Sequence, residues 1–132
     1  EIGSVLDVGC GAGTAALILA RRARRVVGTD INPRAILLSR INAAINGIAN
    51  AEFFEGDLFA PVEGRTFDRI VSQPPFVARH DHARASAYLD GGTRGDEIAL
   101  RLLHDAPRHM NPGGRAFALR WAAPNRRDPA TD

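Results

Sequence analysis

The chain has 132 residues, of which 45% are hydrophobic and 24% charged, as in a soluble globular protein of one domain. Its formal net charge of +2 is too small to indicate a nucleic-acid partner, and we attribute the use of arginine for all 17 basic residues to genome composition. No run of 18 apolar residues, signal peptide or lipidation motif is present, and the single cysteine, Cys10, excludes an internal disulfide, so we expect a cytoplasmic protein without a membrane partner.

The first predicted strand, residues 4–8, leads directly into a glycine-rich loop. Three glycines alternate there with small residues, in the order Gly9, Cys10, Gly11, Ala12, Gly13. Strand, glycine loop and helix form the local geometry that presents backbone N–H groups to a ligand and lets the backbone approach it. A dinucleotide fingerprint needs G-x-G-x-x-G, but Thr14 stands where the last glycine would be. The pattern is D-x-G-x-G-x-G, led by Asp7; a simple tight turn is the alternative.

The next segments predict a helix, a strand and a second helix. Residues 14–23 are rich in alanine and leucine and end in arginines, which favour a helix C-terminus. Residues 25–30, RVVGTD, are a short strand that ends in an acid. Asn32 and Pro33 suit the start of a helix, and Gly47 suits its end. We expect the apolar face of this helix to comprise Ala35, Leu38, Ile41, Ala44, Ile45 and Ile48.

The second half of the chain continues the alternation of strands and helices. We expect a strand at 51–55, a polar turn, a strand at 67–72, a long loop from 73 to about 95, a helix at 97–110, a turn at 111–114 and a strand at 115–121. Pro107 should end or kink its helix early. Residues 1–121 thus form the domain, and we expect 122–132 to be a flexible tail.

Such an alternation predicts an α/β fold with a parallel sheet and right-handed crossovers. In such sheets a ligand binds at the carboxyl ends of the strands. Four unusual loop sequences follow the predicted strands at that edge: residues 9–13, Asp30, Asp57 and residues 73–76. Their coincidence at one edge is the strongest functional argument in the sequence.

The D-x-G-x-G-x-G loop resembles the first motif of the class I S-adenosylmethionine-dependent methyltransferases. The stretches GTDINPRAI, EGDLFAPVEGRTFDRIVS and YLDGGTRGDEIALRLLHDAPRHMNPGGRAFAL resemble segments of the release-factor glutamine methyltransferases and their ribosomal-RNA relatives. The resemblance implies a Rossmann-like sheet with strand order 3-2-1-4-5 and a cofactor loop that includes Gly9, Gly11 and Gly13. In that family an antiparallel pair of strands completes the sheet, and we expect this chain to be truncated before that pair.

The resemblance also implies roles in binding S-adenosylmethionine. Asp30 would accept hydrogen bonds from the ribose hydroxyls, and Ile31 would face the adenine ring. Asp57 would accept a hydrogen bond from the adenine amine, with the backbone of Leu58 beside it. Asp7 would orient the glycine loop or reach the methionine amino group, directly or through water. The alternatives are an ordinary N-cap or turn acid at Asp30 and a turn-forming aspartate at Asp57.

SQPPF, residues 72–76, resembles the N-P-P-[YF] signature of methyltransferases that act on a nitrogen attached to a planar group. By this resemblance, the side-chain carbonyl of Gln73 and the backbone carbonyl of Pro74 would hold the target amine while Phe76 stacks on the target. Gln73 replaces the usual asparagine and is longer by one methylene. The acceptor is an RNA base, a protein glutamine side chain or a small metabolite. A double proline that simply ends a strand is the alternative.

Other functional classes remain open at this stage. One is a non-catalytic S-adenosylmethionine-binding or scaffold module, and a less favoured one is a nicotinamide-dependent oxidoreductase. The triplet His80-Asp81-His82, with His104 and His109, could suggest a metal, but we interpret these histidines as solvated and expect no metal site. We also discard Cys10 as a nucleophile, because the sequence offers it no base.

Overall fold

The computed structural model describes residues 1–73 and 97–118. Within them lie five strands, β1 (Ile2–Val8), β2 (Ala23–Asp30), β3 (Ala51–Glu55), β4 (Phe67–Ser72) and β5 (Met110–Ala118). The helices are α1 (Thr14–Ala20), α2 (Pro33–Ile45) and α3 (Glu97–Asp105), with short 3-10 turns η1 (Ala60–Val62) and η2 (Ala106–His109). No helix of the described segments is long and apolar enough to cross a membrane.

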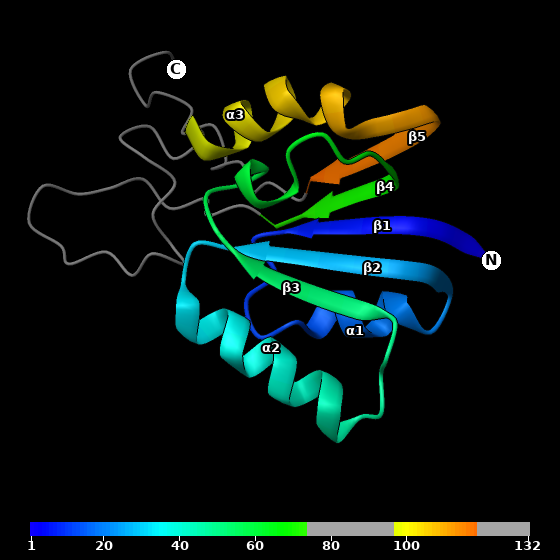
Figure 1. Cartoon of the computed structure of the whole chain (residues 1–132). Helices are drawn as coiled ribbons and strands as arrows, with labels where there is room; N and C mark the ends of the chain where they lie inside the picture. Colours follow the sequence, from blue (N-terminus) through cyan, green and yellow to red (C-terminus); the bar gives the residue numbers. More distant parts are fainter. Residues whose placement is uncertain (74–96, 119–132) are drawn as a thin grey trace, which may run out of the picture.

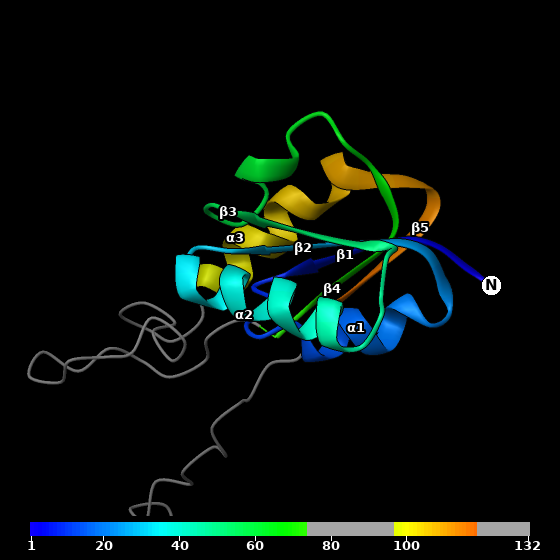
Figure 2. The same cartoon turned by 60° about the horizontal axis from the view of Figure 1, so that its bottom comes forward.

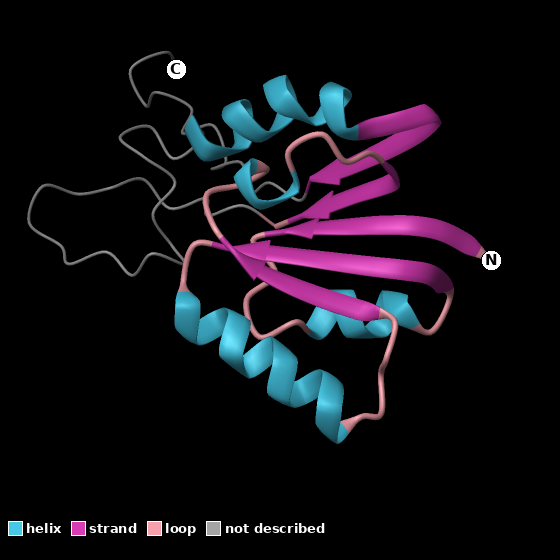
Figure 3. Ribbon diagram, viewed as in Figure 1, coloured by secondary structure: helices cyan, strands magenta, loops and turns pink. Residues whose placement is uncertain are grey.

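The five strands form one parallel sheet in the order β3-β2-β1-β4-β5 (Figure 1). This confirms the predicted fold class and strand order. Helices α1 and α2 cover one face of the sheet and α3 covers the other (Figures 2 and 3). Both faces of the central strands are therefore buried, which explains why these strands are near-continuous apolar runs in the sequence.

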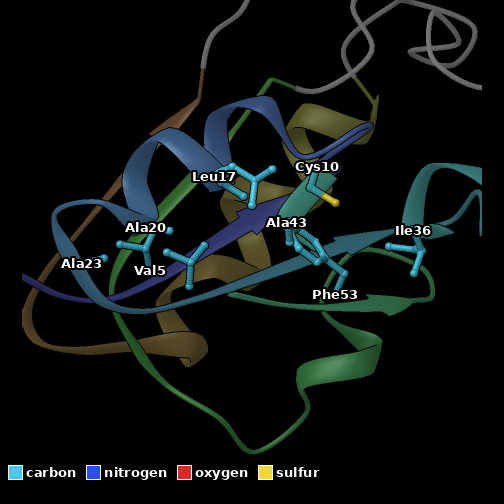
Figure 4. Close-up of a cluster of buried hydrophobic side chains, with 10 residues drawn as sticks. Val5, Cys10, Leu17, Ala20, Ala23, Ile36, Ala43 and Phe53 are labelled. Atoms are coloured by element: carbon cyan, nitrogen blue, oxygen red, sulfur yellow. The ribbon is translucent and has the colours of Figure 1, made fainter. Parts of the chain in front are cut away.

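The core consists of two clusters, one on each face of the sheet. The cluster under α1 and α2 is drawn in Figure 4 and contains Val5, Cys10, Ala16, Leu17, Ala20, Ala23, Val26, Ile36, Ala43 and Phe53. The cluster under α3 contains Leu6, Val8, Val27, Phe59, Val62, Phe67, Ile70, Leu102 and Ala106. Along β1, Val5 belongs to the first cluster and Leu6 to the second, as the alternation of a strand requires.

Two predictions about the helices are wrong. Helix α1 ends at Ala20 and not at Ala23, because Ala23 already pairs with Ile2 as the first residue of β2. Two of the arginines assigned to the helix end, Arg24 and Arg25, therefore lie on a strand.

The apolar face predicted for α2 is confirmed at Ala35 and wrong at most other positions. The buried residues of α2 are Ala35, Ile36, Ser39 and Ala43. The predicted Leu38, Ile41 and Ile45 are 40%, 43% and 75% exposed. The helix lies close to the glycine loop: a Cβ on Gly13 would come within 3.0 Å of Ser39 Oγ. A small residue such as Ser39 suits this close contact, and Ile36 is the large aliphatic residue that α2 buries.

Several predicted boundaries are confirmed. Asn32 caps α2 by accepting from the N–H of Arg34, and Gly47 follows the helix with φ 63°. Helix α3 ends at Asp105, two residues before Pro107. Strand β5 differs from the prediction because it begins at Met110, and the expected turn at 111–114 forms an irregularity within the strand. The predicted long loop, the end of the last predicted strand and the tail lie outside the described residues.

Candidate functional site

The register of the sheet brings the predicted site segments to one edge. Val8, the last residue of β1, lies opposite Thr29 of β2 and Ser72 of β4. The residues that leave the sheet next to one another at this edge are Gly9, Asp30 and Gln73. On the other side of β2, Asp30 pairs with Glu55, so the turn that contains Asp57 begins beside it. All four segments that sequence analysis singled out begin at this edge.

The glycine loop is fastened to β2 through its own N–H groups. Gly9 and Cys10 both donate to the carbonyl of Thr29, at 2.8 and 2.9 Å. Gly11 donates to Asp30 Oδ2 at 2.9 Å, and Gly13 donates to the carbonyl of Cys10 at 2.9 Å. The expectation that the loop presents its N–H groups to a ligand is therefore wrong for these four residues.

The loop instead offers bare backbone to an open space. A Cβ on Gly9 or Gly11 would meet nothing within 4 Å, whereas a Cβ on Gly13 would contact Ser39 and Phe53. Ser39 Oγ also donates to the carbonyl of Gly11 at 2.7 Å, which holds the loop against α2. Gly9 and Gly11 thus line a surface that a ligand can approach closely, and Gly13 serves the packing of α2.

Asp30 holds the loop and keeps part of its acceptor capacity. Its Oδ2 accepts from Gly11 N–H and its Oδ1 from Asn32 N–H, both at 2.9 Å. A carboxylate has about four lone-pair sites, so each oxygen can still accept one further hydrogen bond. The remaining sites suit a pair of vicinal hydroxyl groups. The Asn32 contact is that of a turn acid, as the alternative predicted, and the Gly11 contact adds that Asp30 holds the glycine loop.

Asp7 is a buried carboxyl with an unpartnered oxygen. Its side chain is on the face of α1, where the N–H of Ala16 hydrogen-bonds to it, and Gly13 provides no side-chain cap for that helix. Burial raises the pKa of Asp7 to about 7; the nearby charge of Asp30 adds to the rise, and the Ala16 hydrogen bond opposes it. Oδ2 has no hydrogen-bond partner in the described part of the chain. A buried carboxylate oxygen in this state is suited to a cationic partner.

Three other residues are predicted to bind the cofactor or to lie beside it: Ile31 follows β2, and Asp57 and Leu58 lie in the turn after β3. Ile31, next to Asp30, is 60% exposed and offers an apolar surface at the edge of the sheet. Leu58 has a positive φ of 47°, and its carbonyl accepts from Thr29 Oγ1 at 2.9 Å. Asp57 Oδ2 accepts from Arg101 Nη2 at 2.8 Å. Sequence analysis missed Arg101, which lies on α3 and is 44 positions away.

Of the three residues predicted to hold the target, the structure describes one. Gln73 is exposed and follows β4 directly. The preceding Ser72 donates to the carbonyl of Val8 at 2.7 Å, which fixes the end of β4 against the start of the glycine loop. Pro74 and Phe76 lie outside the described residues.

Neither a nucleophile nor a metal centre accompanies these residues in the described segments. Cys10 is buried, and burial together with the nearby charge of Asp7 raises its thiol pKa to about 12, so the thiolate is not populated at neutral pH. Residues 1–73 and 97–118 contain no group of three histidine, cysteine or acidic side chains that could hold a metal ion. His80, Asp81 and His82 lie outside these ranges.

The hydrogen-bond acceptors at this edge fit S-adenosylmethionine. The cofactor has a ribose with two hydroxyls, an adenine amine, a cationic amino group and a carboxylate. The two acceptor sites left on Asp30, the carboxylate of Asp57 and the unpartnered oxygen of Asp7 match its donors in kind. The open backbone at Gly9 and Gly11 leaves room for it beside the loop.

Comparison with known proteins agrees with this chemistry. The family model described as "Methyltransferase small domain" matches residues 1–122. A release factor glutamine methyltransferase of Geobacter sulfurreducens is 38% identical over 122 residues, covering 84% of this chain and 43% of that protein. A ribosomal RNA small subunit methyltransferase C of Alcanivorax borkumensis is 36% identical over 127 residues, covering 96% of this chain and 34% of that protein. The solved 16S rRNA N2 methyltransferase of T. thermophilus, in complex with AdoMet and guanosine, matches with a TM-score of 0.68 and 28% identity, over 87% of this chain and 28% of that one. The chain spans less than half the length of each of these proteins.

Proposed function

Because the chain belongs to the methyltransferase small domain family, we propose that it binds S-adenosylmethionine and transfers its methyl group to a nitrogen attached to a planar group. The observation that carries the proposal is the convergence of Asp7, Asp30, Asp57 and the open glycine loop on the edge where Gln73 follows β4. The matched proteins, which act on glutamine or ribosomal RNA by their names, support a nitrogen acceptor.

The cofactor side of the proposal assigns one contact to each acidic residue. Asp30 accepts hydrogen bonds from the two ribose hydroxyls, and Asp57 accepts a hydrogen bond from the exocyclic amine of adenine. Asp7 pairs with the cationic amino group, which supplies the partner that its buried Oδ2 lacks. Ile31 offers its exposed side chain to the adenine ring, and Leu58 contributes backbone at the same place.

The acceptor side rests on Gln73 and on the residues that follow it. When bound, the cofactor would supply an activated methyl group on a sulfonium: the C–N bond forms as the S–CH3 bond breaks, which leaves S-adenosylhomocysteine, and the nitrogen releases one proton to solvent. The protein has to orient the acceptor nitrogen and exclude competing groups. The amide carbonyl of Gln73 accepts a hydrogen bond from the target amine and directs the nitrogen lone pair. Pro74 and Phe76 belong to the same proposal, as a backbone acceptor and a stacking ring.

The proposal is tested with S-adenosylmethionine that carries a labelled methyl group. The full chain is incubated separately with total RNA, with release factors and ribosomal proteins, and with small amines, and mass spectrometry locates the label. We expect label on an RNA base or on a glutamine amide. Binding of S-adenosylhomocysteine with no transfer to any acceptor would favour a non-catalytic binding module. Binding of NADH in preference to S-adenosylhomocysteine would favour an oxidoreductase.

The role of Gln73 is tested with the labelled acceptor. Gln73→Ala should lower kcat about 100-fold, in keeping with the loss of a positioning contact, and should leave S-adenosylhomocysteine affinity unchanged. Gln73→Asn restores the residue usual in the family signature but withdraws the amide by one methylene, so it shows whether the site needs the longer side chain. Arg108→Ala, a change on an exposed residue of η2, is the control. If all variants turn over like the parent, Gln73 is only the last residue before a proline turn.

A further inference from the structure

The backbone around Asp57 is fixed against β2. Gly56 N–H donates to the carbonyl of Asp30 at 2.9 Å, and the carbonyl of Leu58 accepts from Thr29 Oγ1 at 2.9 Å. The carbonyl of Asp57 itself accepts from Ala60 N–H at 2.9 Å. These contacts place the Cα of Asp57 beside Asp30 but leave the orientation of its side chain to other groups.

Within the described segments, Arg101 of α3 holds the side chain of Asp57. Arg101 Nη2 donates to Oδ2 at 2.8 Å, and both side chains are about half exposed, at 52% and 51%. Oδ1 receives no hydrogen bond from any residue in the described segments. The hydrogen bond to Asp57 and then its charge raise the pKa of Arg101, as expected for a guanidinium that pairs with a carboxylate. One oxygen of Asp57 is therefore engaged and the other is available.

The position of Arg101 is itself well defined. It lies in the second turn of α3, and the next residue, Leu102, is 1% exposed in the cluster beneath that helix. Ala99, two residues earlier, is 6% exposed in the same helix. The guanidinium thus extends from a helix whose other face is packed into the core. The position of this helix therefore determines where Arg101 holds the carboxylate of Asp57.

We propose that Arg101 is a positioning residue, which fixes the carboxylate of Asp57 so that Oδ1 accepts a hydrogen bond from the exocyclic amine of adenine. This inference rests on the proposed function. According to this inference, Asp57 and Arg101 together make the site prefer adenine over hypoxanthine. Hypoxanthine has a carbonyl oxygen in place of the exocyclic amine, and a carboxylate repels that oxygen. Sites built to accept a hydrogen bond reject analogues that lack the donor. An exposed ion pair that only supports the fold would affect both bases equally.

The test measures dissociation constants by calorimetry for S-adenosylhomocysteine and for S-inosylhomocysteine, its hypoxanthine analogue. The proteins are the parent chain, Arg101→Ala, Arg101→Lys and, as a matched control, Arg108→Ala. Arg108 is an arginine of η2 that pairs with Asp105 at 3.3 Å and does not contact Asp57. Circular dichroism checks that each variant is folded.

We expect the parent to prefer the adenine ligand by about 10- to 100-fold, the range for a hydrogen bond to a charged group. Arg101→Ala should lower this preference about two- to fivefold, since exposed ion pairs contribute little each. Arg101→Lys should recover part of it, and Arg108→Ala should leave it unchanged. The inference is overturned if Arg101→Ala keeps the full preference, if the control loses as much, or if the parent binds both ligands equally. A parent that binds neither ligand refutes the proposed function itself.

Discussion

Replacing Asp7 with asparagine should make the protein more stable than the parent in neutral and alkaline solution. Burial raises the pKa of Asp7 from the usual 3.8 to about 7 in the folded state. Below about pH 4 the carboxyl is protonated in both the folded and the unfolded chain, so it imposes no penalty. Between about pH 4 and 7 the unfolded chain releases a proton that the folded chain retains, so the free energy of unfolding of the parent falls as the pH rises. Asparagine does not titrate, and its curve lacks this fall.

The magnitude follows from the size of the shift. About three pH units at roughly 1.4 kcal/mol each mean that the stability of Asp7→Asn relative to the parent should rise by an amount on the order of 4 kcal/mol between about pH 4 and pH 7. A buried amide nitrogen without a partner would cost about 1–3 kcal/mol, but it would shift the whole curve of the variant and leave its slope unchanged. The diagnostic quantity is therefore the pH dependence of the difference.

Urea unfolding followed by circular dichroism, at half-unit steps from pH 4 to 8.5, measures both curves. Parallel curves over this range would refute the reasoning. The same variant should bind S-adenosylhomocysteine more weakly, because a neutral amide cannot pair with the cationic amino group. A gain in stability together with a loss of binding is the result expected when the buried charge is retained for a ligand.

Three further predictions follow from the contacts of the site and of β4. Gly11→Ala should cost about 1–2 kcal/mol of stability, because the backbone there has a positive φ, and should also weaken S-adenosylhomocysteine binding. Gly13→Ala should cost more stability, because its Cβ would also meet Ser39. Equal losses of stability in urea unfolding would contradict this. Asp30→Asn should weaken S-adenosylhomocysteine binding about 10- to 100-fold in calorimetry, and an unchanged dissociation constant would exclude the ribose contact. Hydrogen bonds from Ser4 and Asn111 lower the pKa of Asp68, so its stabilisation is present at neutral pH and is lost as the pH falls through that lowered pKa; acid unfolding of Asp68→Asn should lack this component, and coincident acid transitions would argue against it.

The sheet could be predicted from the sequence because its strands are short apolar runs bounded by glycine, proline or acidic residues. The boundaries of β3 and β4 agree with the prediction, and the strand order agrees as well. The apolar face of α2 could not be predicted from periodicity, because the helix buries Ile36 with the small residues Ala35, Ser39 and Ala43 and exposes Leu38, Ile41 and Ile45. The distance between a helix and its neighbours decides which side chains fit, and that distance depends on Gly13, which belongs to another element.

The site shows the same division between local and long-range information. Asp7 and Asp30 lie at the carboxyl ends of β1 and β2, and Asp57 and the glycines come just after strands, so the topology alone places them at one edge. Their hydrogen-bond partners lie on other elements and could not be predicted. Thr29 takes up the N–H groups of the loop, and Arg101 reaches Asp57 from α3. Sequence analysis thus identified which residues meet but not which of their polar atoms remain available.

The two core clusters differ in when they can form during synthesis of the chain. All the buried members of the cluster beneath α1 and α2 lie between Val5 and Phe53, so most of this face can form from the first half of the chain, and the partly buried Val71 joins it from β4. The cluster beneath α3 needs Leu102 and Ala106, and the pairing of β1 with β4 joins residues 64 positions apart. Closing such long loops is slower than forming local contacts. We therefore expect the glycine loop and Asp30 to assemble before β4, which precedes Gln73, and α3, which carries Arg101, join them.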